Sequence, residues 1–321
     1  MNILITSAGQ RVSLVRAFQQ ELKGQFPGYK VFTTDMQPQL SAACNVSDQY
    51  FKVKRVTDPA YIDELVELCL KQDIKMVVPT IDTELQVLAC HKEKFAAKGI
   101  QVIVSSAAFV DKCRDKRNTN AFFQQRGIEI PRTIDKHNPT FPLFIKPFDG
   151  SLSVDIYIIH KAEDLHEHHL TNPRFLFMEY MNKTEYDEYT VDMYFDKTNR
   201  LRCIVPRKRI LIRAGEINKG LTSKNSIVPF LKEKLDYIEG AIGCLTGQFF
   251  LHKTSGRIVG IEVNARFGGG YPLSYRAGAN YPQWLIKEYY KNESIPYTDS
   301  WEDNLLMLRY DDEVLVHGYQ N

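Results

Sequence analysis

IVGIEVNARFGGG, residues 258–270, is an apolar strand pattern that runs into three consecutive glycines. Side chains alternate between the two faces of a strand, so Glu262, Asn264 and Arg266 are predicted to point the same way. Carboxylate and amide oxygens suit magnesium, and arginine forks onto phosphate oxygens. Gln248, in the preceding segment GQFFLHK, could supply another oxygen ligand. The pattern indicates a metal–phosphate site, although a surface strand with solvated polar residues would alternate in the same way.

A second segment, FPLFIKPFDGSLS, places Lys146 at the end of an apolar strand. Pro147 then prevents regular strand pairing, so the ammonium group is expected at a strand-to-loop junction. The loop contains Gly150, Ser151 and Ser153, whose backbone amides could fold over phosphates. Taken alone, the same segment also fits a surface lysine. Its interpretation as a phosphate site depends on the metal-site strand downstream.

The segment FLFMEYMNKTEYDEYTVDMYF ends one strand with Glu179, Tyr180 and Met181 and has Glu188 at the start of the next. A chain that turns at a strand end exposes backbone groups able to contact an adenine edge. A carboxylate at the next strand start can accept hydrogen bonds from ribose hydroxyls. A hairpin with acidic side chains fits the spacing equally well.

The run VPRKRILIRAGEINKG is basic, and Arg207, Arg209 and Arg213 alternate with other residues along a predicted strand. The whole chain of 321 residues carries 41 Lys and Arg against 39 Asp and Glu, a net charge of +2. That balance gives no general field for nucleic acid or acidic membranes. The run therefore favours a site for a small anionic substrate over a nucleic-acid partner.

The first hundred residues alternate strand and helix patterns, which predicts a parallel sheet with its ligand crevice at the carboxyl ends of the strands. The early segment TSAGQRV has one glycine where a dinucleotide fingerprint needs three, so a nicotinamide oxidoreductase is disfavoured. Asp82 and Glu84 follow a later strand and are candidates for substrate contact, although they could simply favour a helix N-terminus. Beyond residue 112 the strands are shorter and suit an antiparallel sheet, and a helix is expected over 227–245.

The compartment can also be predicted from composition. No apolar run is long enough to cross a bilayer, and the start MNILITSAGQ does not resemble a signal peptide. The six cysteines are widely spaced and form no CxxC pair, which suits reduced thiols. We therefore expect a cytoplasmic protein without membrane association.

In their order, these motifs resemble the ATP-grasp superfamily, most closely its branch similar to the carbamoyl-phosphate synthase large chain, as a single unit. The resemblance implies an α/β and α+β fold with three parts. A Rossmann-like, parallel-sheet pre-ATP-grasp domain would cover residues 1–111. A first ATP-grasp subdomain with a lid loop would cover 112–178, and a second with the metal site would cover 179–321.

The resemblance also implies roles for single residues. Nucleotide binding falls to Lys116, Lys146, Gly150, Ser151, Ser153, Glu179, Tyr180, Met181 and Glu188. Gln248, Glu262 and Asn264 match the magnesium (or manganese) ligands, and Arg266 and Lys146 match the catalytic cations. The substrate candidates are Arg207, Arg209, Arg213, Asp82 and Glu84.

The expected activity is a Mg-ATP-dependent ligase that joins a small-molecule carboxylate to an amine, or to a thiol, through an acyl-phosphate. A homodimer is compatible with the resemblance. Leu152 and Asp155 depart from the glycine-rich, basic lid common in the family. A nucleotide-binding module without catalysis is therefore the alternative.

Overall fold

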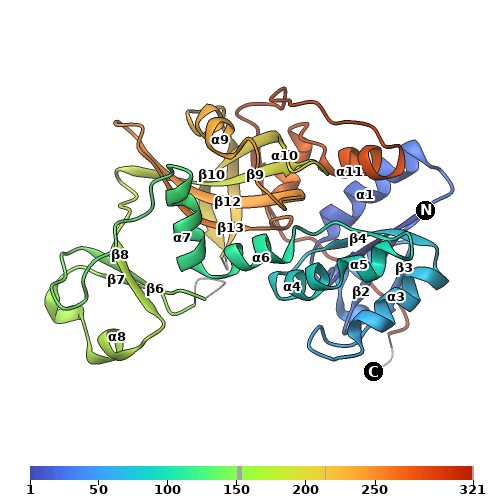
Figure 1. The fold of residues 1–321 in the computed structure, drawn as a ribbon, viewed down its shortest axis with the longest axis horizontal. Coiled ribbons are helices and arrows are strands. Elements are labelled where there is room, and N and C mark those ends of the chain that lie inside the picture. The colour runs from blue at the N-terminus through green and yellow to red at the C-terminus, as the bar shows by residue number, and fades with distance from the viewer. Residues whose placement is uncertain (150–153, 214, 320–321) are drawn as a thin grey trace.

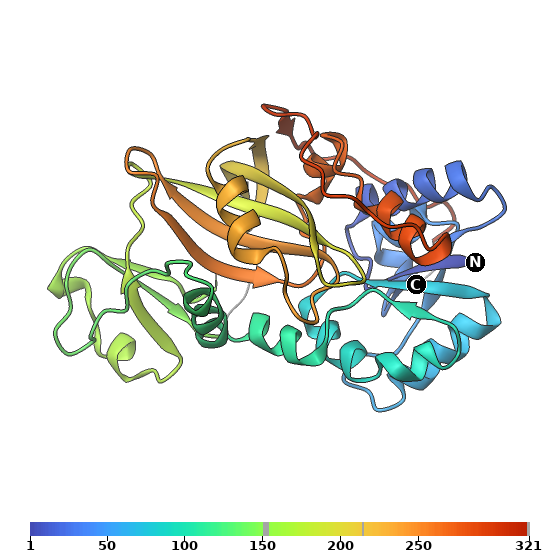
Figure 2. The same cartoon turned by 45° about the horizontal axis from the view of Figure 1, so that its top comes forward.

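The computed structural model describes residues 1–149, 154–213 and 215–319 and contains three sheets (Figure 1). A five-stranded sheet lies at one end of the molecule and a three-stranded sheet at the other, with a six-stranded sheet between them (Figures 1 and 2). In the described part of the chain, no helix has the length and apolarity needed to span a membrane.

The N-terminal sheet is fully parallel with strand order β3-β2-β1-β4-β5, as the alternating pattern predicts. The strands are β1 (Asn2–Thr6), β2 (Val31–Asp35), β3 (Gln49–Lys52), β4 (Ile74–Pro79) and β5 (Gln101–Val102). The helices and turns around it are α1 (Val12–Gln25), η1 (Pro38–Leu40), α2 (Ala42–Val46), α3 (Tyr61–Lys71), α4 (Asp82–Cys90) and α5 (Lys92–Ala96). The strand order reverses between β1 and β4, and ligand crevices in such sheets form outside the carboxyl ends at that point.

The small sheet is antiparallel with order β7-β6-β8, and β6 is its central strand. This lobe contains β6 (Leu143–Pro147), β7 (Tyr157–Ile159), η2 (Ala162–Asp164), α8 (Glu167–Thr171) and β8 (Phe175–Glu179). Leu143, Ile145 and Phe177 are buried in a core of its own. The lobe is therefore a separate packing unit beside the central sheet.

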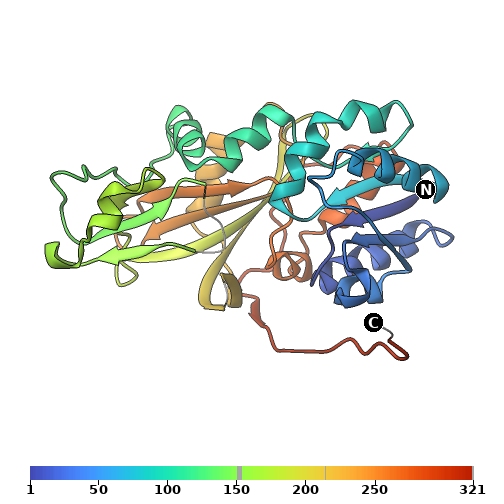
Figure 3. The same cartoon turned by 90° about the horizontal axis from the view of Figure 1, so that it is seen from below.

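The central sheet has the order β13-β12-β9-β10-β11-β14, and its neighbouring strands are antiparallel. Its strands are β9 (Tyr186–Phe195), β10 (Leu201–Arg213), β11 (Glu216–Thr222), β12 (Gly243–His252), β13 (Ile258–Asn264) and β14 (Leu306–Leu308). The nearby helices are α6 (Ala107–Arg114), α7 (Lys116–Gln125), α9 (Ile227–Leu235), α10 (Tyr271–Arg276) and α11 (Tyr281–Tyr290). After β14 the chain runs as an extended segment along the outside of the molecule (Figure 3).

Helix α7 packs closely on β13 because the strand has a glycine at the contact. A Cβ atom built on Gly260 would lie 2.7 Å from the ring of Phe123. Such a distance is not tolerated between non-bonded carbons. The glycine in the motif IVGIEVN therefore lets α7 approach, at Phe123, the strand that carries Glu262.

The helix expected over 227–245 is wrong in its second half. Helix α9 ends at Leu235, and residues from Gly243 onward form β12. Gly240 and Gly243 both adopt positive φ angles, of 78° and 73°, which a right-handed helix cannot contain. The apolar periodicity continues through this segment and conceals the change of structure.

A buried ion pair fixes the middle of the central sheet. Arg207 on β10 donates to Asp192 on β9 through Nε at 2.7 Å and Nη2 at 2.9 Å. The two side chains are 1% and 0% exposed. Ser274 and Thr246 also donate to the Asp192 carboxylate, at 2.6 and 3.3 Å. The pair thus joins β9, β10, β12 and α10 at one point.

We predict that Asp192→Ala destabilises the protein by about 3–5 kcal/mol, because it leaves the Arg207 charge buried without a counter-ion. The matched control is Asp311→Ala, which breaks the ion pair with Arg213 at the surface, where the side chains are 85% and 67% exposed. That change should cost no more than about 1 kcal/mol. Urea unfolding of both variants measures the difference, and equal costs would contradict the prediction.

Candidate active site

A row of polar side chains crosses four strands of the central sheet. Gln248 on β12 lies opposite Glu262 on β13 and opposite Thr190 on β9. Thr190 in turn lies opposite Arg207 on β10. Directly opposite residues in antiparallel strands point to the same face. Residues far apart in sequence are therefore brought together on one face.

The three predicted metal ligands lie on this face, with Asn264 two residues beyond Glu262 on β13. Asn264 donates to Glu262 at 3.3 Å, and Gln248 donates to Glu188 through its amide nitrogen. Within the described residues, no group of three or more His, Cys, Asp or Glu side chains could hold a metal ion. One carboxylate and two amides fit a hard cation that shares its oxygen ligands with phosphates. This set of side chains differs from a metal site in which protein carboxylates supply all the ligands.

Lys146, on the small sheet, lies within electrostatic reach of Glu262. The side chain is 8% exposed at the end of β6. Burial lowers the pKa of Lys146 to about 8; Glu262 acts to raise it, and Lys116 lowers it further. The structure therefore places two predicted phosphate-binding lysines within electrostatic reach of one another, with Glu262 near Lys146.

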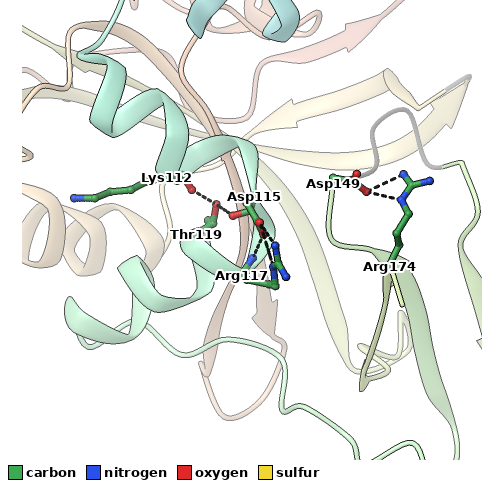
Figure 4. Close-up of polar contacts among 6 residues, drawn as sticks. All are labelled: Lys112, Asp115, Arg117, Thr119, Asp149 and Arg174. Atoms are coloured by element: carbon green, nitrogen blue, oxygen red, sulfur yellow. Dashed lines mark hydrogen bonds and ion pairs between the residues drawn. The ribbon is translucent and has the colours of Figure 1, made fainter. Parts of the chain in front are cut away.

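The N-terminus of α7 is tied to the loop that follows β6. The backbone N–H of Lys116 donates to the carbonyl of Phe148 at 3.0 Å. The guanidinium of Arg117 lies 3.8 Å from the centre of the Phe148 ring. Asp115 caps the helix by accepting from the Arg117 N–H at 2.8 Å (Figure 4). These contacts fix the position of Lys116 relative to the end of β6.

Asp149, next in the chain, accepts from Arg174 at 2.8 and 3.0 Å (Figure 4). The predicted lid residues Gly150, Ser151 and Ser153 lie outside the described residues.

The predicted ribose acid lies next to the metal-ligand group. Glu188 pairs with Arg209 at 3.0 Å and accepts from Gln248. Arg209 also donates to Thr190 at 3.2 Å. The structure thus places Glu188 and Arg209 together on the face that carries Glu262.

The predicted adenine hinge is at the edge between the small and central sheets. Arg257 donates to Glu179 at 2.9 Å. Although burial favours the neutral acid, these hydrogen bonds lower the pKa of Glu179. Met181 is buried with Tyr186. The Glu179 side chain is occupied by Arg257 and is therefore not free to contact a base.

The N-terminal domain reaches the same site through one ion pair. Asp82, in the first turn of α4, accepts from Arg266 at 2.8 Å and through a second, parallel contact. Asp82 and Arg266 are 184 residues apart in sequence. The prediction that both contribute to one site is compatible with this contact, in which Asp82 orients Arg266.

Three substrate candidates are in unsuitable places. Glu84 is fully buried and accepts from Thr6 at 2.9 Å and from Tyr61. Arg207 is buried against Asp192, whereas Arg213 is exposed. Burial and existing partners count against the substrate roles predicted for Glu84 and Arg207, although the Nη1 atom of Arg207 has no hydrogen-bond partner. Arg213 belongs to the sheet surface. The alternation on β10 could not reveal this, because β10 passes from the core to the solvent along its length.

Two of the glycines that follow Phe267 are packed closely against side chains of the central sheet. A Cβ atom on Gly269 would lie 2.2 Å from Glu216, and one on Gly270 would lie 2.1 Å from Arg207. Sequence reasoning missed Glu216. The signal available was the glycine triplet itself, which indicates a close approach without naming the partner.

Comparisons with known proteins agree with this architecture. A family model for the PylC-like N-terminal domain matches residues 3–103, and one for ATP-grasp in the biosynthetic pathway with Ter operon matches residues 171–308. No curated protein sequence matches the chain significantly.

Solved structures resemble the chain over almost its whole length. Biotin carboxylase from Campylobacter jejuni, in complex with β-γ-ATP, aligns with a TM-score of 0.72 at 14% identity, over 95% of this chain and 74% of that one. N5-carboxyaminoimidazole synthetase from Staphylococcus aureus aligns with a TM-score of 0.68 at 16% identity, over 92% and 78%. Identities this low show the fold alone.

Because the pKa of Lys146 is lowered to about 8, we predict that the protein's affinity for nucleotide phosphates falls as the pH rises through about 8. A bound phosphate favours the charged lysine and raises its pKa, so binding takes up a proton above that pH. The affinity should fall by up to about tenfold for each pH unit above that value. Calorimetry with Mg-ATP measures it; Lys146→Gln should bind more weakly and lose this dependence, and Lys146→Arg should bind without it. An unchanged slope in Lys146→Gln would assign the dependence to another group.

Proposed function

We propose that this chain, which belongs to the ATP-grasp superfamily, is a Mg-ATP-dependent ligase that joins a small carboxylate to an amine or a thiol. The observation that carries the proposal is that the buried Lys146 on β6 and Glu262 on β13, from two different sheets, lie close enough for their charges to interact. A buried lysine beside a row of oxygen ligands suits a polyphosphate bound between the sheets. We also propose the three-part division at residues 1–111, 112–178 and 179–321.

The proposed reaction has two steps. The substrate carboxylate attacks the γ-phosphorus of ATP; the new O–P bond forms as the bond to the bridging oxygen breaks, which yields an acyl-phosphate and ADP. The nucleophile then attacks the acyl carbon, phosphate leaves, and the nucleophile loses its proton. Catalysis of this kind rests on positioning and charge stabilisation, so no strong protein base is needed.

The residues of the site have distinct proposed roles. Gln248, Glu262 and Asn264 would hold magnesium, which neutralises phosphate charge when bound. Lys146 and Lys116 would bind the phosphates. Arg266 would stabilise the transferred phosphoryl group, held in place by Asp82. Glu188 would accept from the ribose, and the turn at Tyr180 and Met181 would contact the base.

One observation favours a second function, nucleotide binding without catalysis. The guanidinium of Arg266 is already engaged by Asp82, and Glu262 is the single carboxylate among the three proposed metal ligands. If Arg266 stays paired with Asp82, the site can bind ATP without stabilising its reaction. The resemblance to the carbamoyl-phosphate synthase branch stays a prediction, supported by Gln248 in place of an acid. The cytoplasmic location also stays a prediction, supported by the free cysteines.

For the nucleotide site, we predict that Mg-ATP raises the unfolding midpoint of the wild type. At a hundredfold excess over Kd, the free energy of unfolding should increase by about 2.7 kcal/mol. Glu262→Gln should lose most of that gain because it removes the carboxylate from the metal ligands. Glu239→Gln, an exposed acid outside the site, is the control and should keep the gain. If folded wild-type protein gains nothing from Mg-ATP, the proposed function fails.

To separate ligase from binding module, ADP release should be measured with a panel of small carboxylates and hydroxylamine as the trapping nucleophile. A ligase forms ADP and a hydroxamate in equal amounts, and only when a suitable carboxylate is present. A protein that binds Mg-ATP but makes no hydroxamate with any carboxylate of a broad panel would favour the binding module.

A further inference from the structure

A small cavity lies at the junction of the N-terminal domain, the β10–β11 hairpin and the glycine triplet. Its volume is about 70 Å³, and its lining includes Gln10, Arg11, Glu216, Gly268, Gly269 and Arg309. Gln10 and Arg11 follow β1, beside the point where the strand order of the parallel sheet reverses. The cavity therefore lies on the β1 side of the crevice in which sheets of this kind bind ligands.

The charges around the cavity are unevenly paired. Glu216 forms an ion pair with Arg309 at 2.9 Å, and Asp82 is taken by Arg266. In the part of the chain that the structure describes, Arg11 forms no ion pair, and its Nη1 atom is buried without a hydrogen-bond partner. A buried guanidinium nitrogen without an acceptor is costly. An anion in the cavity would remove that cost.

We propose that this cavity binds the anionic group of the non-nucleotide substrate, a carboxylate or a phosphate, with Arg11 as its main contact. The inference rests on the proposed function and names the substrate class for that same site. Arg309 would be the second contact, because it also lines the cavity while it pairs with Glu216.

The size of the cavity supports a single small anionic group. A water molecule takes about 30 Å³ in the liquid, so the cavity has room for a group of the size of a carboxylate or phosphate. Gly268 and Gly269 form part of the wall, where the backbone can approach a ligand closely. The N-terminus of α1, which starts directly after Arg11, adds a favourable positive potential.

The position of the cavity links it to the proposed chemistry. Burial lowers the pKa of Arg11, and the positive charge of Arg266 lowers it further. Arg266 is therefore close enough to act electrostatically on whatever Arg11 binds. An anion at Arg11 would hold the substrate beside the residue proposed to stabilise the transferred phosphoryl group.

The test measures binding of acetate and of inorganic phosphate to the whole protein by calorimetry, against chloride at equal ionic strength. Arg11→Gln should lower the affinity for the bound probe about tenfold or more, the usual effect of losing a hydrogen bond to a charged group. Arg11→Lys should retain part of the affinity. Arg16→Gln, exposed on the same helix, is the matched control and should bind as wild type.

The outcomes separate this inference from the proposed function. Stronger wild-type binding of acetate assigns a substrate carboxylate, and stronger binding of phosphate assigns a phosphate group, provided that Arg11→Gln weakens it. Equal probe binding by wild type and a folded Arg11→Gln, or no binding of either probe, overturns the inference. In either case, Mg-ATP binding measured on the same samples reports independently on the nucleotide site.

Discussion

The buried ion pair between Arg207 and Asp192 is the constraint on which the arrangement of the site depends. Two charges removed from water are stable only when their partners and geometry are nearly complete. Asp192 meets this requirement through Ser274 and Thr246, which fixes α10 and β12 relative to the pair. Arg207 in turn lies against the backbone at Gly270, where a side chain would collide with it. The course of the chain after the metal-site strand is thus set from inside the sheet.

The sequence predicts best those features that depend on local patterns. The alternation of strands and helices gives the parallel N-terminal sheet, and the alternation along residues 258–264 places Glu262 and Asn264 together. Gln248 adds to them because consecutive antiparallel strands pair as neighbours. Glycine is the weak point of such reasoning: Gly240 and Gly243 end a helical pattern that the apolar residues alone would continue.

Features that depend on distant contacts could not be predicted in this way. Glu84 has the spacing of a helix N-terminal acid, and only the fold shows that the Tyr61 hydroxyl donates a hydrogen bond to its carboxylate. Arg11 resembles any polar residue at the start of a helix until the hairpin carrying Glu216 and the tail carrying Arg309 close around it. Charge, burial and partner number are set by these long-range neighbours, whereas sequence spacing reports only the face on which a residue lies.

The site contains two desolvated cationic side chains, Lys146 and Arg11, that lack an ion-pair partner among the described residues. Glu188, Asp82 and Glu216 are each paired with an arginine. Lys146 and Arg11 form no ion pair among the described residues, and burial lowers the pKa of each. Holding such charges out of water lowers stability, so their retention calls for ligands that neutralise them. Lys146 lies near the Glu262 carboxylate, and Arg11 lines the cavity. A reaction between two anions, a nucleotide phosphate and a substrate carboxylate, would require this arrangement, since mutual repulsion otherwise keeps the reacting groups apart.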